Sequence, residues 1–223
     1  MAGMKGFYLG LGGIAVIGAG ALWWASRNAA ATVPLGPIPI DAVLSAKGFP
    51  GYVEGSPDAP VEVVEFADFQ CPACRETWVL TVQDVKERLV KTGQVRYVFH
   101  DFPLDIHDKA RVAHHAGACA DEQGAAWAMH DKLFLQQNEW SSSPGTGEKL
   151  FRKYAGEIGL DTEAYDECMG SGRFRARIQA SYDAALELGI GGTPAFVIGG
   201  QRYGALTYDQ IKGIVDSLTA ATP

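Results

Sequence analysis

The feature that most constrains this chain is a pair of cysteines that follows directly on a run of apolar residues. The run "VEVVEFADF" (61–69) is rich in Val and Phe, which is typical of a β-strand buried on both faces. Cys71 and Cys74 come next, and Pro72 between them suits the first turn of a helix, where the N–H that proline lacks has no partner. The sequence therefore predicts a helix over 72–91 whose N-terminus carries both cysteines.

A C-x-x-C pair in this position indicates thiol–disulfide exchange. At a helix N-terminus the free backbone N–H groups and the helix dipole stabilise a thiolate, here at Cys71. Cys74 lies one turn later on the same face and can resolve the mixed disulfide that the thiolate forms. A zinc site would need four ligands, and the other two cysteines form no second close pair. An inert disulfide staple is the remaining alternative.

Two further features suit redox chemistry. Glu65 stands in the predicted strand, and a carboxyl group buried beneath the cysteines would have a raised pKa and could relay the proton of Cys74. The alternative is a partly exposed strand carboxylate. Pro194 opens a later strand in "GGTP", so we expect a cis Thr193–Pro194 bond, with an ordinary trans proline at a sheet edge as the alternative.

The remaining pattern predicts an α/β domain with a helical block inserted into it. The segment "QVRYVFHDF" (94–102) is expected to pair in parallel with the first strand, across the intervening helix. Breaks at Gly and Ser divide residues 104–189 into four or five predicted helices. "TPAFVIGGQRYGA" predicts two strands around a Gly-Gly turn, before a terminal amphipathic helix. We assign 61–103 and 190–220 to the α/β domain and 104–189 to the inserted domain.

The first 27 residues differ from the rest. The stretch 7–25 has no charged residue and is close to the length of about 20 apolar residues that crosses a bilayer. We expect an uncleaved N-terminal transmembrane anchor (1–27), with the catalytic domain on the periplasmic or extracellular side. The alternative is a signal peptide cleaved at "NAAAT" (28–32), which would leave a secreted protein. Residues 28–60 are rich in Ala, Pro and Gly and are interpreted as a spacer.

Charge and histidine placement exclude two classes of function. The formal charge is -7, whereas a nucleic-acid surface needs clustered positive charge, so we predict no nucleic-acid partner. The neighbouring histidines His114 and His115 would not share a helix face, and no metal is predicted.

The phrases "VEFADFQCPAC", "WAMHDKLF" and "GIGGTPAFVIGGQRYGA" resemble the DsbA-like thiol–disulfide oxidoreductases, in their membrane-anchored or secreted bacterial branch. The resemblance covers about residues 50–220. It implies a thioredoxin-like α/β fold with an inserted helical domain, preceded here by the single N-terminal transmembrane helix.

The resemblance also implies a role for individual residues. Cys71 matches the exposed attacking cysteine, Cys74 the buried resolving cysteine and Glu65 the buried acid. Pro194 matches the cis-proline that faces the disulfide, and the backbone of Thr193 would pair with an extended substrate segment. The chain departs from the best-known member at Ala73, which replaces a histidine. No imidazole therefore supports the thiolate, and the helix dipole is left to do so.

Cys119 and Cys168 form an even leftover pair in the predicted helical insert. In an exported protein such a pair suggests a structural disulfide, which could stabilise by about 4 kcal/mol on the chain-entropy model. Two buried free thiols are the alternative. Some members of the resembling branch carry a comparable second bridge, which favours the disulfide.

The predicted function is a DsbA-like oxidase that donates the Cys71–Cys74 disulfide to exported proteins with cysteines. The resemblance implies reoxidation by a membrane protein of the DsbB or vitamin-K-epoxide-reductase-like type, with no bound cofactor, and we expect a monomer. One alternative is a reductase or isomerase that uses the same pair. Another is a redox-inactive chaperone or peptide-binding module that holds extended chains beside Pro194.

Overall fold

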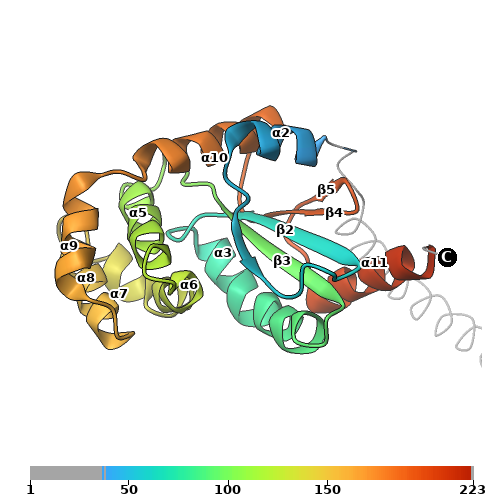
Figure 1. Ribbon diagram of the computed structural model, residues 1–223, viewed down its shortest axis with the longest axis horizontal. Helices are drawn as coiled ribbons and strands as arrows, with labels where there is room; N and C mark the ends of the chain where they lie inside the picture. The colour runs from blue at the N-terminus through green and yellow to red at the C-terminus, as the bar shows by residue number, and fades with distance from the viewer. Residues whose placement is uncertain (1–36, 38, 222–223) are drawn as a thin grey trace, which may run out of the picture.

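The computed structural model describes residue 37 and residues 39–221 (Figure 1). The predicted membrane anchor at 7–25 and the cleavage alternative at 28–32 lie outside the described residues. Among the helices that are described, none has the length and apolar character needed to span a bilayer.

The centre of the fold is a five-stranded mixed sheet in the order β1-β3-β2-β4-β5. Its strands are β1 (Tyr52–Glu54), β2 (Val61–Ala67), β3 (Val95–Asp101), β4 (Ala195–Ile198) and β5 (Gln201–Tyr203). β2 and β3 are parallel, as predicted, and β1, β4 and β5 pair antiparallel with their neighbours. β2 is the middle strand, so the turn that follows it emerges from the centre of the sheet.

One continuous helical stretch links the two parallel strands. It begins as α3 (Pro72–Thr77) and continues through η1 (Trp78–Val82), α4 (Gln83–Val85) and η2 (Lys86–Val90), where η denotes π-helical hydrogen bonding. Buried side chains along it pack on the sheet face that also receives α11 (Tyr208–Ala221). The predicted helix is confirmed, and it begins with Cys71 as its N-cap.

The opposite face of the sheet is covered by α2 (Ile40–Lys47) and α10 (Arg175–Glu187), so the sheet lies between two helical layers (Figure 1). Ile40 and Val43 are buried in this layer. The predicted spacer over 28–60 is therefore wrong for α2 and β1. In the described part of this Pro- and Gly-rich segment, Ile40, Val43 and Tyr52 are buried instead of standing off from the domain.

Six helices lie between β3 and β4, one or two more than expected for this stretch. They are α5 (Ala110–Asp121), α6 (Ala126–Leu135), α7 (Gln137–Ser141), α8 (Glu148–Glu157), α9 (Thr162–Ser171) and α10. Five of these, α5 to α9, form a block beside the sheet, and α10 leads the chain back to it (Figure 1). One apolar cluster includes residues of this block together with Cys71, Cys74 and Phe69. The turn over 68–71, which leads into the C-x-x-C pair and is called the active-site turn below, is therefore packed between the sheet and the helical block.

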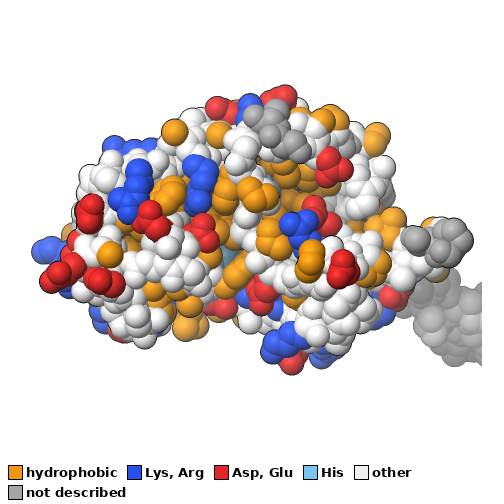
Figure 2. Space-filling view, viewed as in Figure 1, with side chains coloured by type: hydrophobic (Ala, Val, Ile, Leu, Met, Phe, Trp, Pro, Cys, Tyr) orange, Lys and Arg blue, Asp and Glu red, His pale blue; other side chains and the backbone are white. Residues whose placement is uncertain are grey.

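The visible surface mixes the two signs of charge. Figure 2 shows acidic and basic side chains interspersed over one face, without a continuous basic surface on that face. This distribution agrees with the net charge of -7.

Candidate active site

The two cysteines of the C-x-x-C pair lie at the start of α3, and both are free thiols in the structure. Cys71 is the N-cap residue, with extended backbone angles. Its side chain is 7% exposed, whereas Cys74 is fully buried. A reagent can therefore approach Cys71 and not Cys74.

The Cys71 thiol is strongly acidified. Its pKa is lowered from 9.0 to about 5, chiefly by a hydrogen bond from the Cys74 thiol. The Thr193 side chain and the backbone N–H groups of Cys74 and Ala73 add to this effect, while burial opposes it. At neutral pH this sulfur is a thiolate, which is the nucleophilic form.

Cys74 has the opposite character. Burial raises its pKa well above 9.0, and its hydrogen bond to Cys71 raises it further. The backbone N–H of Asp68 donates to Cys74 Sγ at 3.5 Å. Cys74 therefore keeps its proton while Cys71 is ionised.

Glu65 is buried in β2, with 2% of its surface exposed. Burial raises its pKa from 4.5 to about 7, although the Tyr97 hydroxyl donates a hydrogen bond to Oε2 and partly offsets the rise. The negative charge of Glu65 is one cause of the raised pKa of Cys74, so the two groups influence each other. A carboxyl group of pKa about 7 can give or take a proton at neutral pH.

The Thr193–Pro194 peptide bond is cis. Pro194 precedes β4, which pairs with β2, and this pairing brings the two loops together. The Cys71 Sγ lies 3.7 Å from the carbonyl oxygen of Thr193. The structure thus brings Thr193 and the cis Pro194 beside the turn that follows the middle strand and carries Cys71.

Sequence reasoning missed Asp68, which shapes the turn before Cys71. Its carboxylate is fully buried and accepts the Gln70 N–H at 2.7 Å, while its carbonyl accepts the Cys71 N–H at 3.0 Å. Beside it, His114 Nδ1 lies 2.6 Å from Asp101 Oδ1, and the Phe69 N–H points at His114 Nε2 at 3.4 Å. A neutral imidazole that carries its proton on Nδ1 satisfies both contacts. An Asp whose side chain accepts the backbone N–H two residues later is a recognised local signal for a turn, but the histidine contact is not local.

Gln137 on α7 was also missed. Its side-chain amide donates to the carbonyl oxygens of Phe69 and Cys71, at 2.7 and 2.9 Å. The side chain is only 3% exposed. The helical block therefore holds the backbone of the active-site turn directly, and this contact bridges residues too distant in sequence for a local pattern to reveal.

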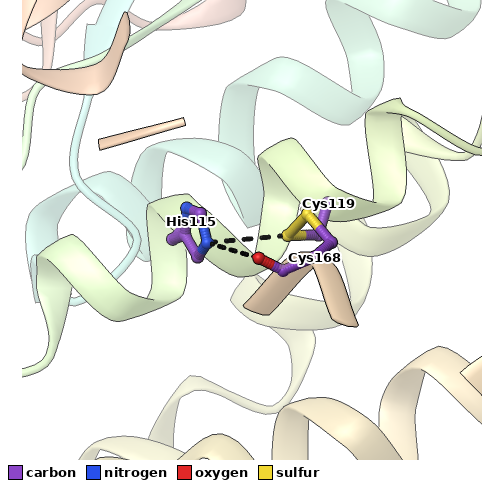
Figure 3. Close-up of side chains that lie close together, drawn as sticks. All are labelled: His115, Cys119 and Cys168. Atoms are coloured by element: carbon purple, nitrogen blue, oxygen red, sulfur yellow. Dashed lines mark hydrogen bonds between the residues drawn. A yellow bond between two sulfur atoms is a disulfide. The ribbon is translucent and has the colours of Figure 1, made fainter. Parts of the chain in front are cut away.

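Cys119 on α5 and Cys168 on α9 are joined in a disulfide, with their Cα atoms 5.7 Å apart. Figure 3 shows His115 beside it: one ring nitrogen, Nε2, lies 3.2 Å from the Cys168 carbonyl oxygen and 3.7 Å from Cys119 Sγ. These three side chains are close enough to share a metal ion, but in the disulfide neither sulfur is a thiolate ligand.

Comparison with known proteins agrees with this geometry. Residues 50–217 match the model of a thioredoxin family. The chain is 30% identical to "Probable disulfide bond formation protein D" of Bacillus anthracis over 170 residues, which cover 73% of this chain and 75% of that protein. The crystal structure of oxidised BdbD from Bacillus subtilis superposes with a TM-score of 0.70 and 22% identity, covering 83% of this chain and 97% of that one.

A second group of relatives is much longer. The chain is 38% identical over 153 residues to "Na(+)/H(+) antiporter NhaA 3" of Salinispora tropica, which covers 68% of this chain but 22% of that protein. The chain thus spans under a quarter of that relative's length. The match to the Bacillus anthracis protein, by contrast, covers 75% of that protein's length. On these grounds the chain belongs to the DsbA-like thiol–disulfide oxidoreductases of the thioredoxin superfamily.

Proposed function

We propose that the protein is an oxidase that donates the Cys71–Cys74 disulfide to cysteine-containing proteins outside the cytoplasm. The observation that carries this proposal is that the pKa values of the two cysteines are shifted in opposite directions. The pKa of Cys71 is lowered to about 5, while that of Cys74 is raised by burial. A stabilised thiolate favours the reduced form, and a protein whose reduced form is stabilised gives up its disulfide readily.

The reaction begins when a substrate thiolate attacks the sulfur of Cys71 in the oxidised protein. The Cys71–Cys74 bond breaks, Cys74 leaves with the electron pair, and Cys71 becomes joined to the substrate sulfur. A second substrate thiolate then attacks that substrate sulfur and releases Cys71 as a thiolate. The substrate loses two electrons and gains a disulfide, and the protein is left as the dithiol seen in the structure.

Glu65 is proposed to handle the proton of Cys74. When Cys74 leaves as a thiolate in an apolar environment, it needs a proton, and the protonated Glu65 carboxyl group can supply one. During reoxidation the Glu65 carboxylate can accept that proton again. Its pKa of about 7 means that both forms are populated at neutral pH.

The Thr193–Pro194 loop is proposed to hold the substrate. The Thr193 carbonyl lies beside the Cys71 sulfur, so backbone hydrogen bonds from an extended segment would place its cysteine at that sulfur. The Cys119–Cys168 disulfide is proposed to be structural. Neither of its cysteines belongs to a C-x-x-C pair, and both are fully buried.

The N-terminal apolar stretch supports a membrane location. We propose that residues 7–25 anchor the protein with its catalytic domain on the periplasmic or extracellular side. A membrane protein of the DsbB or vitamin-K-epoxide-reductase-like type would then reoxidise the dithiol. Membrane fractionation of the full chain tests the anchor, since recovery in the soluble exported fraction would indicate signal cleavage and secretion.

A redox equilibrium titration of the full chain tests the direction of electron flow. Alkylation of the Cys71–Cys74 dithiol in thiol buffers gives the potential, and a sample with Cys119 and Cys168 both changed to Ala separates the two disulfides. We expect a potential on the oxidising side of thioredoxin, toward that of DsbA at about -120 mV. A potential at or below about -270 mV would favour a reductase. Cys71→Ser should abolish thiol turnover. A wild type without thiol turnover, whose holdase activity survives Cys71→Ser, would overturn the assignment in favour of a chaperone or peptide-binding module.

A further inference from the structure

Ile106 is an apolar side chain left almost entirely in solvent. It lies between β3 and α5, and 83% of its surface is exposed, more than any other large hydrophobic residue that the structure describes. Single exposed apolar side chains are common on protein surfaces and need no function. What distinguishes Ile106 is the way its loop is attached to the active-site turn.

The first attachment is to Asp68. The Leu104 N–H donates to Asp68 Oδ2 at 2.9 Å, and His107 Nδ1 lies 2.6 Å from the same oxygen. The loop is also closed on itself, because the His107 N–H donates to the Leu104 carbonyl at 3.0 Å. Ile106 lies inside this closed segment, and the fully buried Asp68 carboxylate holds the segment in place through these two contacts.

The second attachment is to Gln70, the residue directly before Cys71. Gln70 Nε2 donates to Asp108 Oδ1 at 2.8 Å, and Gln70 Oε1 accepts the Lys109 N–H at 2.7 Å. The side chain of Gln70 thus spans from the active-site turn to the far end of the loop. Together, Asp68 and Gln70 hold both ends of the segment that carries Ile106.

An apolar side chain on a fixed loop binds more favourably than one on a mobile loop, because little backbone freedom is lost on contact. The thiol chemistry at Cys71 indicates which kind of molecule would contact Ile106. A protein that still needs a disulfide is incompletely folded, and its apolar side chains are exposed near its free cysteines. A substrate sulfur joined to Cys71 would be held at the residue that directly follows Gln70, and Gln70 is bonded to this loop.

We propose that Ile106 is a specificity-determining contact that packs against an apolar side chain of the substrate, close in sequence to the reacting cysteine. The inference rests on the proposed thiol–disulfide exchange at Cys71. Ile106 takes no part in electron or proton transfer, so it changes which substrates are oxidised and leaves the potential unaltered.

The test uses two reduced peptides, each with two cysteines, that differ only in whether Leu or Ser flanks the first cysteine. Oxidation rates are measured with the oxidised full chain and with Ile106→Ser, Ile106→Leu and Leu186→Ser variants. Leu186 on α10 is 50% exposed and serves as the matched control for loss of an exposed apolar side chain. The redox potential of each variant is measured in parallel.

We expect Ile106→Ser to lower kcat/KM about tenfold for the Leu peptide, mainly through KM, and to leave the Ser peptide nearly unchanged. Ile106→Leu should keep the preference, and Leu186→Ser should match the wild type. Equal loss for both peptides, or no loss for either, would overturn the role of Ile106. Failure of the wild type to oxidise either peptide would instead overturn the proposed function.

Discussion

The acidity of Cys71 can be traced to one donor, and replacing Cys74 tests this assignment. The hydrogen bond from the Cys74 thiol is the largest cause of the lowered pKa of Cys71. Cys74→Ala removes the donor, while Cys74→Ser leaves a hydroxyl donor of similar size. Hydrogen bonds to charged groups contribute about 1.5–3 kcal/mol, and 1.36 kcal/mol corresponds to one pKa unit. We therefore expect a pKa of about 6–7 in Cys74→Ala and of about 5 in Cys74→Ser.

The assay is the pH dependence of thiolate absorbance and of iodoacetamide alkylation, with the Cys119–Cys168 disulfide intact so that Cys71 is the one free thiol of each variant. At pH 5.5 a thiol of pKa about 5 is roughly three-quarters ionised, and one of pKa about 6.5 roughly one-tenth ionised. The two variants should therefore differ several-fold in alkylation rate at that pH. Identical titration curves would refute the assignment and leave the backbone N–H groups and the helix dipole as the main cause.

Three other changes test separate parts of the site. Glu65→Gln should raise the free energy of unfolding of the reduced protein by about 1–3 kcal/mol at pH 8, because a buried carboxyl group of raised pKa costs stability as pH rises from 4.5 through about 7. Denaturant titration at pH 5 and 8 checks the sign of this effect. The same variant should slow thiol exchange. Changing Cys119 and Cys168 together to Ala should lower stability by about 2–5 kcal/mol in urea titrations without moving the Cys71–Cys74 potential. Gln137→Ala should cost about 1–3 kcal/mol in the same titration, since the carbonyls of Phe69 and Cys71 each lose a buried donor and Cys71 keeps the Arg75 N–H. An unchanged midpoint would contradict the contact.

Local patterns were enough to predict the strand, the C-x-x-C helix and the parallel pair. Residues 61–74 contain the apolar run, the proline and the cysteines in a continuous order, so each step constrains the next. The Thr-Pro element and the Gly-Gly turn are local in the same way. By contrast, the packing of α2 and β1 onto the sheet was not predicted, because their few apolar residues stand among prolines and glycines that favour extended chain.

The polar contacts of the site could not be predicted, because each joins segments that are far apart in sequence. Gln137 reaches the Cys71 carbonyl from α7, and His114 reaches Asp101 and the Phe69 N–H from α5. A Gln or His in a helix gives no local sign of its partner. The sequence could suggest that Glu65 is buried, but the Tyr97 hydroxyl bonded to it depends on the register of β2 with β3.

The causes of the Cys71 pKa also answer the question raised by Ala73. The acidity comes from Cys74 and from nearby backbone and Thr193 groups, so no imidazole between the cysteines is needed. The Cys74 donor is lost when the disulfide forms, so this stabilisation belongs to the dithiol alone. Relative to a thiol of pKa about 7, as in thioredoxin, a pKa of about 5 stabilises the dithiol at pH 7 by at most about 2.3 kcal/mol, and by less where solvent screens the sulfur.

That free energy corresponds to at most about 50 mV, whereas about 150 mV separates thioredoxin from DsbA. The Cys71 thiolate therefore makes the reduction potential more oxidising than that of thioredoxin, but it accounts for only part of the difference of about 150 mV from DsbA. A potential between these two proteins would need no further cause. A potential near about -120 mV would require a second difference between the dithiol and disulfide forms, and the Glu65–Cys74 coupling, which acts on the buried sulfur, is the place to look for it. If Glu65→Gln then left that potential unchanged, the source would have to lie outside the buried acid.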